Sequence, residues 1–208
     1  MAGKVLEESG RVSRWVRPVS RSFELGLPMS RIMCSDGQPA HILDVVMQDW
    51  GPDMPTLHQC ENRMMGPSAL SRCGRVDWDD LAALADDSPL PLWADGHSSR
   101  AGSNDRVPSD LLRQLSGSLK LLSIDELILS RTIGFNGQTK HRAEFCLGGS
   151  HYNLALTDAV AADWLGSRRS LELTGSYVCV SLAVPFNDGF AYKVAAAVIT
   201  KERAGVSA

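Results

Sequence analysis

The chain has 208 residues and a mass of 22.5 kDa, and 44% of its residues are hydrophobic while 22% are charged. These values are typical of a globular protein with one or two small domains, and they exclude a disordered or membrane-embedded chain. The formal net charge of −3 also excludes a strongly basic protein of histone or ribosomal type, whose whole surface binds polyanions.

The cysteines and the termini indicate a cytoplasmic protein. Five cysteines, at positions 34, 60, 73, 146 and 179, form no Cys-x-x-Cys pair, and their odd number does not suit a secreted disulfide framework. Residues 58–60 supply a His and a Cys, but no second ligand pair stands at zinc-finger spacing, so we expect no metal site. No apolar signal segment opens the chain, and the run at 194–199 is too short to span a bilayer.

The first half predicts short strands and one helix. Residues 11–18 and 42–47 show the alternation and β-branched content of strands. Residues 76–85 predict a helix in which Asp77 is the N-cap and Asp80 occupies the capping-box position. Residues 86–110 show no periodicity and are rich in Pro, Gly, Ser and Asp. A loop of this length is usually functional or connects two domains.

The second half predicts a small barrel. Residues 119–129 suggest a strand, a turn and a second strand, while residues 135–138 carry a hairpin or loop signal. The remaining elements are a hairpin at 141–156 around Gly148 and Gly149, a helix at 157–165 with Val160, Trp164 and Leu165 buried, and strands at 177–184 and 190–199 joined by a tight turn. About five strands with one inserted helix suit an OB-type barrel. We therefore expect a mainly β protein with minor α content, built from two OB-like barrels, at 1–117 and 118–208, with short helices and a long irregular connector.

Eight segments carry a family resemblance. They include Trp93-Ala-Asp-Gly-His-Ser-Ser-Arg and Asn104-Asp-Arg-Val-Pro, together with residues 14–20, 41–46, 58–62, 152–158, 180–186 and 192–199. Together they resemble the dual OB-containing domain family of bacteria in order along nearly the whole chain. The resemblance implies two OB-like barrels, binding of nucleic acid or nucleotides by analogy of fold, and a place in a larger defence or stress assembly. It also implies a further strand before residue 1, either encoded upstream or lost in this member.

No local motif indicates catalysis. Gly-rich phosphate loops, a nucleophile elbow and a His-Glu-x-x-His zinc motif are all missing from the sequence. We therefore expect no catalytic residue and no cofactor, although an enzyme assembled from scattered residues stays open.

The first candidate binding residues are Arg14, Trp15 and Arg17, in a basic stretch at 11–21. The arginines could neutralise phosphates while the indole ring stacks on a base. The alternative is that Trp15 lies in the core and the arginines form a solvated strand face.

The second candidate group is Arg100, Asn104, Asp105 and Arg106, in the long loop. Asn and Arg could read a base edge or a phosphate while Asp105 orients the arginine. The alternative is an internal network that fixes the loop to the barrel, which is the commoner use of such pairs.

Tyr192 and Lys193, on the last predicted strand, complete the candidates, and a core position is equally open for Tyr192. These residues predict a recognition module for nucleic acid or a nucleotide-like ligand, with no membrane partner. The alternative function is a protein–protein adaptor that docks a partner through the acidic stretch at 77–95 and through barrel edges.

Overall fold

A computed structural model describes residues 1–20, 27–86, 91–133 and 137–206. Spatial contacts divide the chain into two compact units. Unit 1 contains Met1–Leu81 and Ser116–Ser118, and unit 2 contains Ala82–Leu115 and Leu119–Ala208. The long loop expected with the first barrel thus has its contacts in the second unit, while the domain boundary at 117/118 stays a prediction. In the described parts of the chain, no helix is long and apolar enough to cross a membrane.

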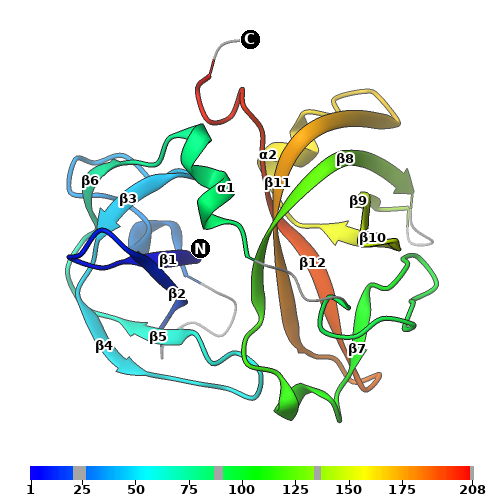
Figure 1. Cartoon of the computed structure of the whole chain (residues 1–208), viewed down its shortest axis with the longest axis horizontal. Helices are drawn as coiled ribbons and strands as arrows, with labels where there is room; N and C mark the ends of the chain where they lie inside the picture. Colours follow the sequence, from blue (N-terminus) through cyan, green and yellow to red (C-terminus); the bar gives the residue numbers. More distant parts are fainter. Residues whose placement is uncertain (21–26, 87–90, 134–136, 207–208) are drawn as a thin grey trace. The chain divides into compact units, whose positions relative to one another are not determined.

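Unit 2 is a closed barrel with the connectivity of an OB fold. Its strands are β8 (Leu119–Ile133), β9 (Thr139–Leu147), β10 (Ser150–Leu156), β11 (Ser170–Pro185) and β12 (Phe190–Ile199). Along the sheet they follow the order β10-β9-β8-β11-β12, and parallel pairing of β10 with β12 closes the barrel (Figure 1). Helix α2 (Ala159–Asp163) joins the third strand to the fourth. The expected mainly β fold with an OB-type barrel is confirmed.

Alternating residues of these strands fill the barrel. The buried set comes from every barrel strand and from α2, and is dominated by Leu122, Ile124, Leu127, Leu129, Ala143, Phe145, Leu154, Val178, Val180, Ala195 and Val198. Side chains of neighbouring positions point to opposite faces of a strand, so the residues between these positions form the outer surface. Gly148 and Gly149 both have positive φ, as the tight turn predicted between β9 and β10 requires.

The strand, turn and second strand expected at 119–129 are one continuous strand, β8. Asp125 and Glu126 are both exposed, which interrupts the alternation of buried and exposed residues. Two consecutive polar residues of this kind are typical of a turn. In the structure the ladder to β11 runs through this point, with Ser176 paired to Ile124 and Thr174 paired to Glu126. Gly175, between them, has φ +56°, a conformation that glycine adopts without strain. The β8–β11 pair therefore bends at this point, and Figure 1 shows β8 and β11 as long curved arrows.

Helix α2 is capped as predicted but packs differently. The Asp158 carboxylate accepts hydrogen bonds from the backbone N–H groups of Val160 and Ala161, which places it as the N-cap. Leu165 is buried and Trp164 is partly buried, but the expected burial of Val160 is wrong, because its side chain is 50% exposed.

Residues 103–108 of the long loop, which we call the loop wedge, fill the gap where β10 and β12 diverge. The parallel pairing of β10 and β12 covers two residue pairs, Ala155 with Val194 and Leu156 with Ala195. Beyond them, Ser103 forms a bridge with Asn153 of β10, and strand β7 (Arg106–Pro108) pairs with the start of β12. Loop residues thus supply the backbone hydrogen bonds that two open strand edges would otherwise lack.

Unit 1 is less regular. One sheet has the order β1 (Gly3–Leu6), β2 (Val12–Val19), β5 (Asn62–Met65), β4 (Trp50–Asp53), and a ribbon pairs β3 (Asp44–Met47) with β6 (Ser71–Arg75). Cys34, Met65 and Leu70 form its buried cluster. The predicted strands at 11–18 and 42–47 correspond to β2 and β3.

The helix expected at 76–85 is much shorter than its pattern. A 3₁₀ turn at Trp78–Asp80 leads into a single turn of α-helix, α1 (Leu81–Leu84). The prediction of a capping box is wrong, because the Asp77 side chain makes no capping hydrogen bond. A helix of one turn cannot be stabilised by its own backbone hydrogen bonds and depends on packing, here on the fully buried Leu81.

Candidate functional site

The candidate site lies on the ribbon formed by β7 and the start of β12. In this antiparallel pair Arg106 is opposite Tyr192, Val107 is opposite Ala191, and Pro108 is opposite Phe190. Val107 and Ala191 are completely buried and pack with Leu112 and Leu182 in a core cluster of unit 2. Arg106, Phe190 and Tyr192 therefore project from the other face, because side chains alternate along a strand.

The β11–β12 turn adds two more side chains to this face. The backbone N–H of Phe186 donates to the carbonyl oxygen of Phe190 at 2.8 Å, and that of Gly189 donates to Phe186 at 3.1 Å. The Asp188 carboxylate accepts a hydrogen bond from the Phe190 N–H at 3.2 Å. Gly189 has φ +82°, so the Asn-Asp-Gly signal in the sequence is used as predicted. These bonds hold Phe186 and Asp188 in place beside β12.

Together, Arg106, Phe186, Asp188, Phe190 and Tyr192 form what we call the aromatic surface. The rings of Phe186 and Tyr192 meet edge to face, with centroids 5.4 Å apart. The guanidinium carbon of Arg106 lies 4.0 Å from the centroid of Phe190, within the range of a cation–π contact. The side chain of Phe186 is 59% exposed, whereas Phe190 and Tyr192 are partly buried. The surface thus offers aromatic rings, one cation and the exposed Asp188 carboxylate.

Hydrogen bonding sets the electrostatics of the aromatic surface. The Tyr192 hydroxyl donates to the Asp188 carboxylate at 2.6 Å, which lowers the pKa of Asp188 and raises the pKa of Tyr192. Asp188 is therefore ionised at neutral pH and holds the phenol in a fixed orientation. The Nε atom of Arg106 is buried and has no hydrogen-bond partner among the described residues.

Sequence reasoning identified Arg106 and Tyr192, and the structure brings them together. The sequence reasoning did not identify Phe186, Asp188 and Phe190. A signal for these was present, because Phe186 and Phe190 flank the predicted Asn-Asp-Gly turn and a tight turn places such flanking residues side by side.

Asp105 points into the protein, and Asn104 is partly buried beside it. Asp105 is 2% exposed, and its carboxylate accepts from the N–H and the hydroxyl of Ser99 at 2.7 and 2.6 Å. Arg142 approaches Asp105 at 3.5 Å and donates to the side chain of Asn153 at 2.7 Å. The Asn104 amide donates to the His151 carbonyl oxygen at 2.9 Å. This arrangement is the internal network considered as the alternative for this loop. It covers Arg142 and Asn153 on the outer face of β9 and β10, whereas Cys146 and His151 on the same strands are exposed. Arg100 lies exposed in the same loop.

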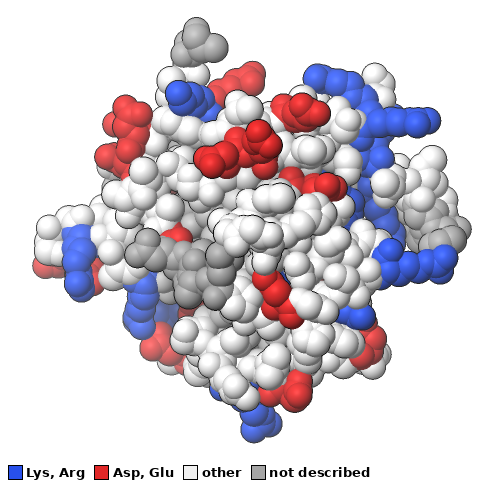
Figure 2. Space-filling view, turned by 45° about the vertical axis from the view of Figure 1, so that its right-hand side comes forward, with Lys and Arg blue, Asp and Glu red and all other residues white. Residues whose placement is uncertain are grey.

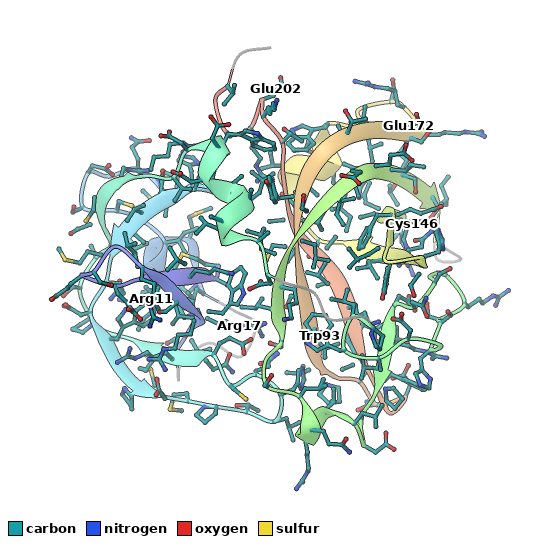
Figure 3. The ribbon with its side chains drawn as sticks, viewed as in Figure 1. Arg11, Arg17, Trp93, Cys146, Glu172 and Glu202 are labelled. Carbon is teal, nitrogen blue, oxygen red and sulfur yellow. The ribbon has the colours of Figure 1, made fainter. Side chains whose placement is uncertain are left out.

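Lys193 points in the opposite direction from Tyr192, into the barrel. Its side chain is 0% exposed, and its Nζ donates to the Ala94 carbonyl oxygen at 2.6 Å and lies 3.4 Å from the Asp95 carboxylate. Burial lowers the pKa of Lys193 to about 8. Tyr152, whose ring lies 5.1 Å from Nζ, donates its own hydroxyl to Asp95, and burial raises its pKa to about 12. Trp93 of the same segment, labelled in Figure 3, packs against the barrel core.

The candidate binding residues of unit 1, Arg14, Trp15 and Arg17, lie on β2 and do not share one exposed face. Arg14 is exposed, whereas Trp15 is partly buried beneath Lys4, whose Nζ lies 5.3 Å from the ring. Arg17 (labelled in Figure 3) donates to the Ser118 hydroxyl at 2.9 Å and lies 3.3 Å from Glu61. Its side chain is only 16% exposed, so Arg17 serves the packing of unit 1, while Arg14 faces solvent.

Two further expectations concern acidic and metal-binding residues. The Asp86 carboxylate, part of the acidic stretch, accepts a hydrogen bond from the Leu121 N–H at 2.7 Å and so anchors the start of β8. Asp87 lies outside the described residues. Within the described ranges, no three His, Cys, Asp or Glu side chains are grouped closely enough to hold a metal ion.

Comparison with known proteins identifies the family of the chain. A model described as the dual OB-containing domain matches residues 1–198, which is nearly the whole chain. No curated protein and no solved structure matches it. Since OB folds typically serve as binding modules, this match indicates a binding function for the chain. With its closed OB-type barrel and this match over both units, the chain belongs to the dual OB-containing domain family.

Proposed function

We propose that the chain is a non-catalytic recognition module that binds single-stranded nucleic acid, or a nucleotide-like ligand with the same base and phosphate chemistry, through the aromatic surface. The observation that carries the proposal is the stacking of Arg106 on Phe190 beside the Phe186–Tyr192 pair. Exposed aromatic rings supply stacking faces for bases, and a stacked guanidinium supplies charge-assisted donors for phosphates or base edges.

The preference for single strands follows from what stacking requires. The bases of a duplex present their flat faces to one another, so a ring on a protein surface cannot stack on them without opening the helix. Bases of a single strand expose these faces. Phe186, which is 59% exposed where β11 enters the β11–β12 turn, is the ring most accessible to such a base.

The position of the surface within the fold supports the same proposal. Oligonucleotide-binding OB folds use the outer face of their second and third strands together with the loops between the first and second strands and between the fourth and fifth strands. Here the loop network around Asp105 and Arg142 covers part of this face, at Arg142 of β9 and Asn153 of β10. The β11–β12 turn, between the fourth and fifth strands, keeps its side chains exposed, and β7 extends this surface with Arg106.

The test is fluorescence anisotropy with labelled single-stranded DNA, single-stranded RNA and both duplexes across a salt series. We expect both single strands to bind more tightly than the duplexes, and Phe186→Ala to weaken single-strand binding by about tenfold, the usual contribution of one stacked base. Val160→Ala changes a similarly exposed apolar residue on α2; it is the matched control and leaves affinity unchanged. Equal affinity of wild type and Phe186→Ala for single strands would contradict the proposal.

The alternative is a protein–protein adaptor that uses the acidic stretch and the barrel edges. It has less support, because Asp86 is engaged in the barrel and the loop wedge pairs with the open edges of β10 and β12. No binding to any nucleic acid at low salt would make a protein partner the better proposal. A place in a larger bacterial assembly stays a prediction.

A further inference from the structure

Unit 2 has a second surface of interest, which is positively charged. Three segments that are separate in the sequence contribute its residues: the end of β8, the start of β9 and the loop before β11. Lys140 at the start of β9 pairs with Thr132 near the end of β8. The Arg131 N–H donates to the Arg169 carbonyl oxygen at 3.0 Å, which joins the end of β8 to the loop before β11. We call Arg131, Lys140, Arg168 and Arg169 the basic hairpin surface.

Arg131 fixes the loop that carries the other two arginines. Its guanidinium donates to the carbonyl oxygens of Gly166 and Ser167, both at 2.9 Å. Arg168 and Arg169 follow directly in the chain, and both are exposed, as is Lys140. Their backbone positions are therefore set, while their charged groups extend into solvent. Figure 2 shows Lys and Arg side chains gathered on this side of the molecule.

The charge of this region is opposite to that of the whole chain. Residues 130–133, 137–142 and 164–171 contain no Asp or Glu, whereas the chain as a whole has a net charge of −3. Arg142 adds no free charge, because it is buried against Asp105. The exposed Asp163 comes directly before the third of these segments, and Glu144 and Glu172, which both pair with Ile128, mark the border of the surface on the strands. The four positive charges of this surface outnumber the neighbouring Asp163 and produce a local attraction for polyanions.

We propose that the basic hairpin surface binds the phosphodiester backbone of a nucleic acid, independently of its bases. This inference rests on the proposed function for the class of partner, but it assigns a separate surface and a separate chemistry. Arginine and lysine side chains on an exposed surface neutralise phosphates and release counterions, so each contact adds to the salt dependence of binding. The aromatic surface then contributes stacking, and the basic hairpin surface contributes charge.

The test uses a single-stranded oligonucleotide in which every base is replaced by an abasic spacer. This probe carries phosphates and offers nothing to stack. We expect wild-type protein to bind it with affinity that falls linearly on a logarithmic salt scale, and Arg168→Ala/Arg169→Ala to reduce the slope by about 1.4, which is roughly 0.7 for each lost contact with a single strand. Arg113→Ala/Lys201→Ala, which removes two exposed charges elsewhere in unit 2, leaves the slope unchanged.

The outcomes separate this inference from the proposed function. Phe186→Ala leaves binding of the abasic probe unchanged, so a failure of stacking does not affect this result. An unchanged salt slope in Arg168→Ala/Arg169→Ala, or no binding of the probe to wild type at low salt, overturns the inference. Equally tight binding of poly-glutamate of the same charge also overturns it, because the surface would then select acidic polypeptides as readily as phosphates.

Discussion

The guanidinium carbon of Arg106 lies 4.0 Å from the centroid of the Phe190 ring, across the β7–β12 ribbon. A strand of only three residues thus places a cation on the face of an aromatic ring, and the opposite side of the same ribbon is buried with Leu112 and Leu182. Because the buried side of the ribbon packs in this core cluster, the position of Arg106 is set before any ligand binds. Such preorganisation reduces the entropy lost on binding.

The first prediction concerns the shape of the Arg106 side chain. Arg106→Lys keeps the charge but removes the planar group that stacks on Phe190. We expect Arg106→Lys to lose about as much single-strand affinity as Arg106→Gln, between roughly 10- and 150-fold, because a charge-assisted hydrogen bond contributes about 1.5–3 kcal/mol. Anisotropy titrations of the two variants test this. Full affinity in Arg106→Lys would show that charge alone matters.

The second prediction concerns the loop network. Asp105→Ala leaves Arg142 buried without its carboxylate, and breaking a buried ion pair from one side costs about 3–5 kcal/mol. We expect the free energy of unfolding in denaturant titrations to fall by about this amount. Asp110→Ala, an exposed aspartate of the same segment, is the control and changes stability by less than about 0.5 kcal/mol. A drop equal to that of the control would mean that the loop does not depend on this pair.

Much of unit 2 could be predicted from the sequence, because its signals are local. Gly148-Gly149 and the Asn-Asp-Gly turn each define a hairpin within a few residues, and Asp158 defines the start of α2. The bend of β8 could not be predicted, because it depends on Gly175 in the partner strand, and the two exposed acidic residues opposite the bend imitate a turn.

The candidate site was predicted in part for the same reason. Arg106 and Tyr192 both carry the right chemistry, but their proximity depends on the β7–β12 register, which no local pattern encodes. Alternation predicts that Tyr192 and Lys193 face opposite sides of the strand. Which side is the interior depends on how the barrel closes, and the structure places the charged Lys193 inside.

The third prediction concerns pH and the buried Lys193. Its pKa of about 8 lies below the ordinary lysine value of 10.5, so between these pH values the unfolded chain binds more protons than the folded one. The stability of the folded state therefore rises as the pH increases from about 8 toward 10.5. We expect Lys193→Met to lose this part of the slope when unfolding is measured in denaturant at pH steps from 7.5 to 9.5. Parallel curves for wild type and variant would contradict the role of Lys193.

The most direct test of the central claim is photocrosslinking of single-stranded DNA that carries 5-iodouracil, followed by mass spectrometry of the linked peptides. A halogenated base reacts with an aromatic ring on which it stacks. Our account predicts crosslinks within residues 186–192, which contain Phe186, Phe190 and Tyr192, and their loss when excess unlabelled strand competes. Crosslinks confined to other peptides, with this region unlabelled while the DNA is bound, would contradict the assignment of the aromatic surface as the base-binding site.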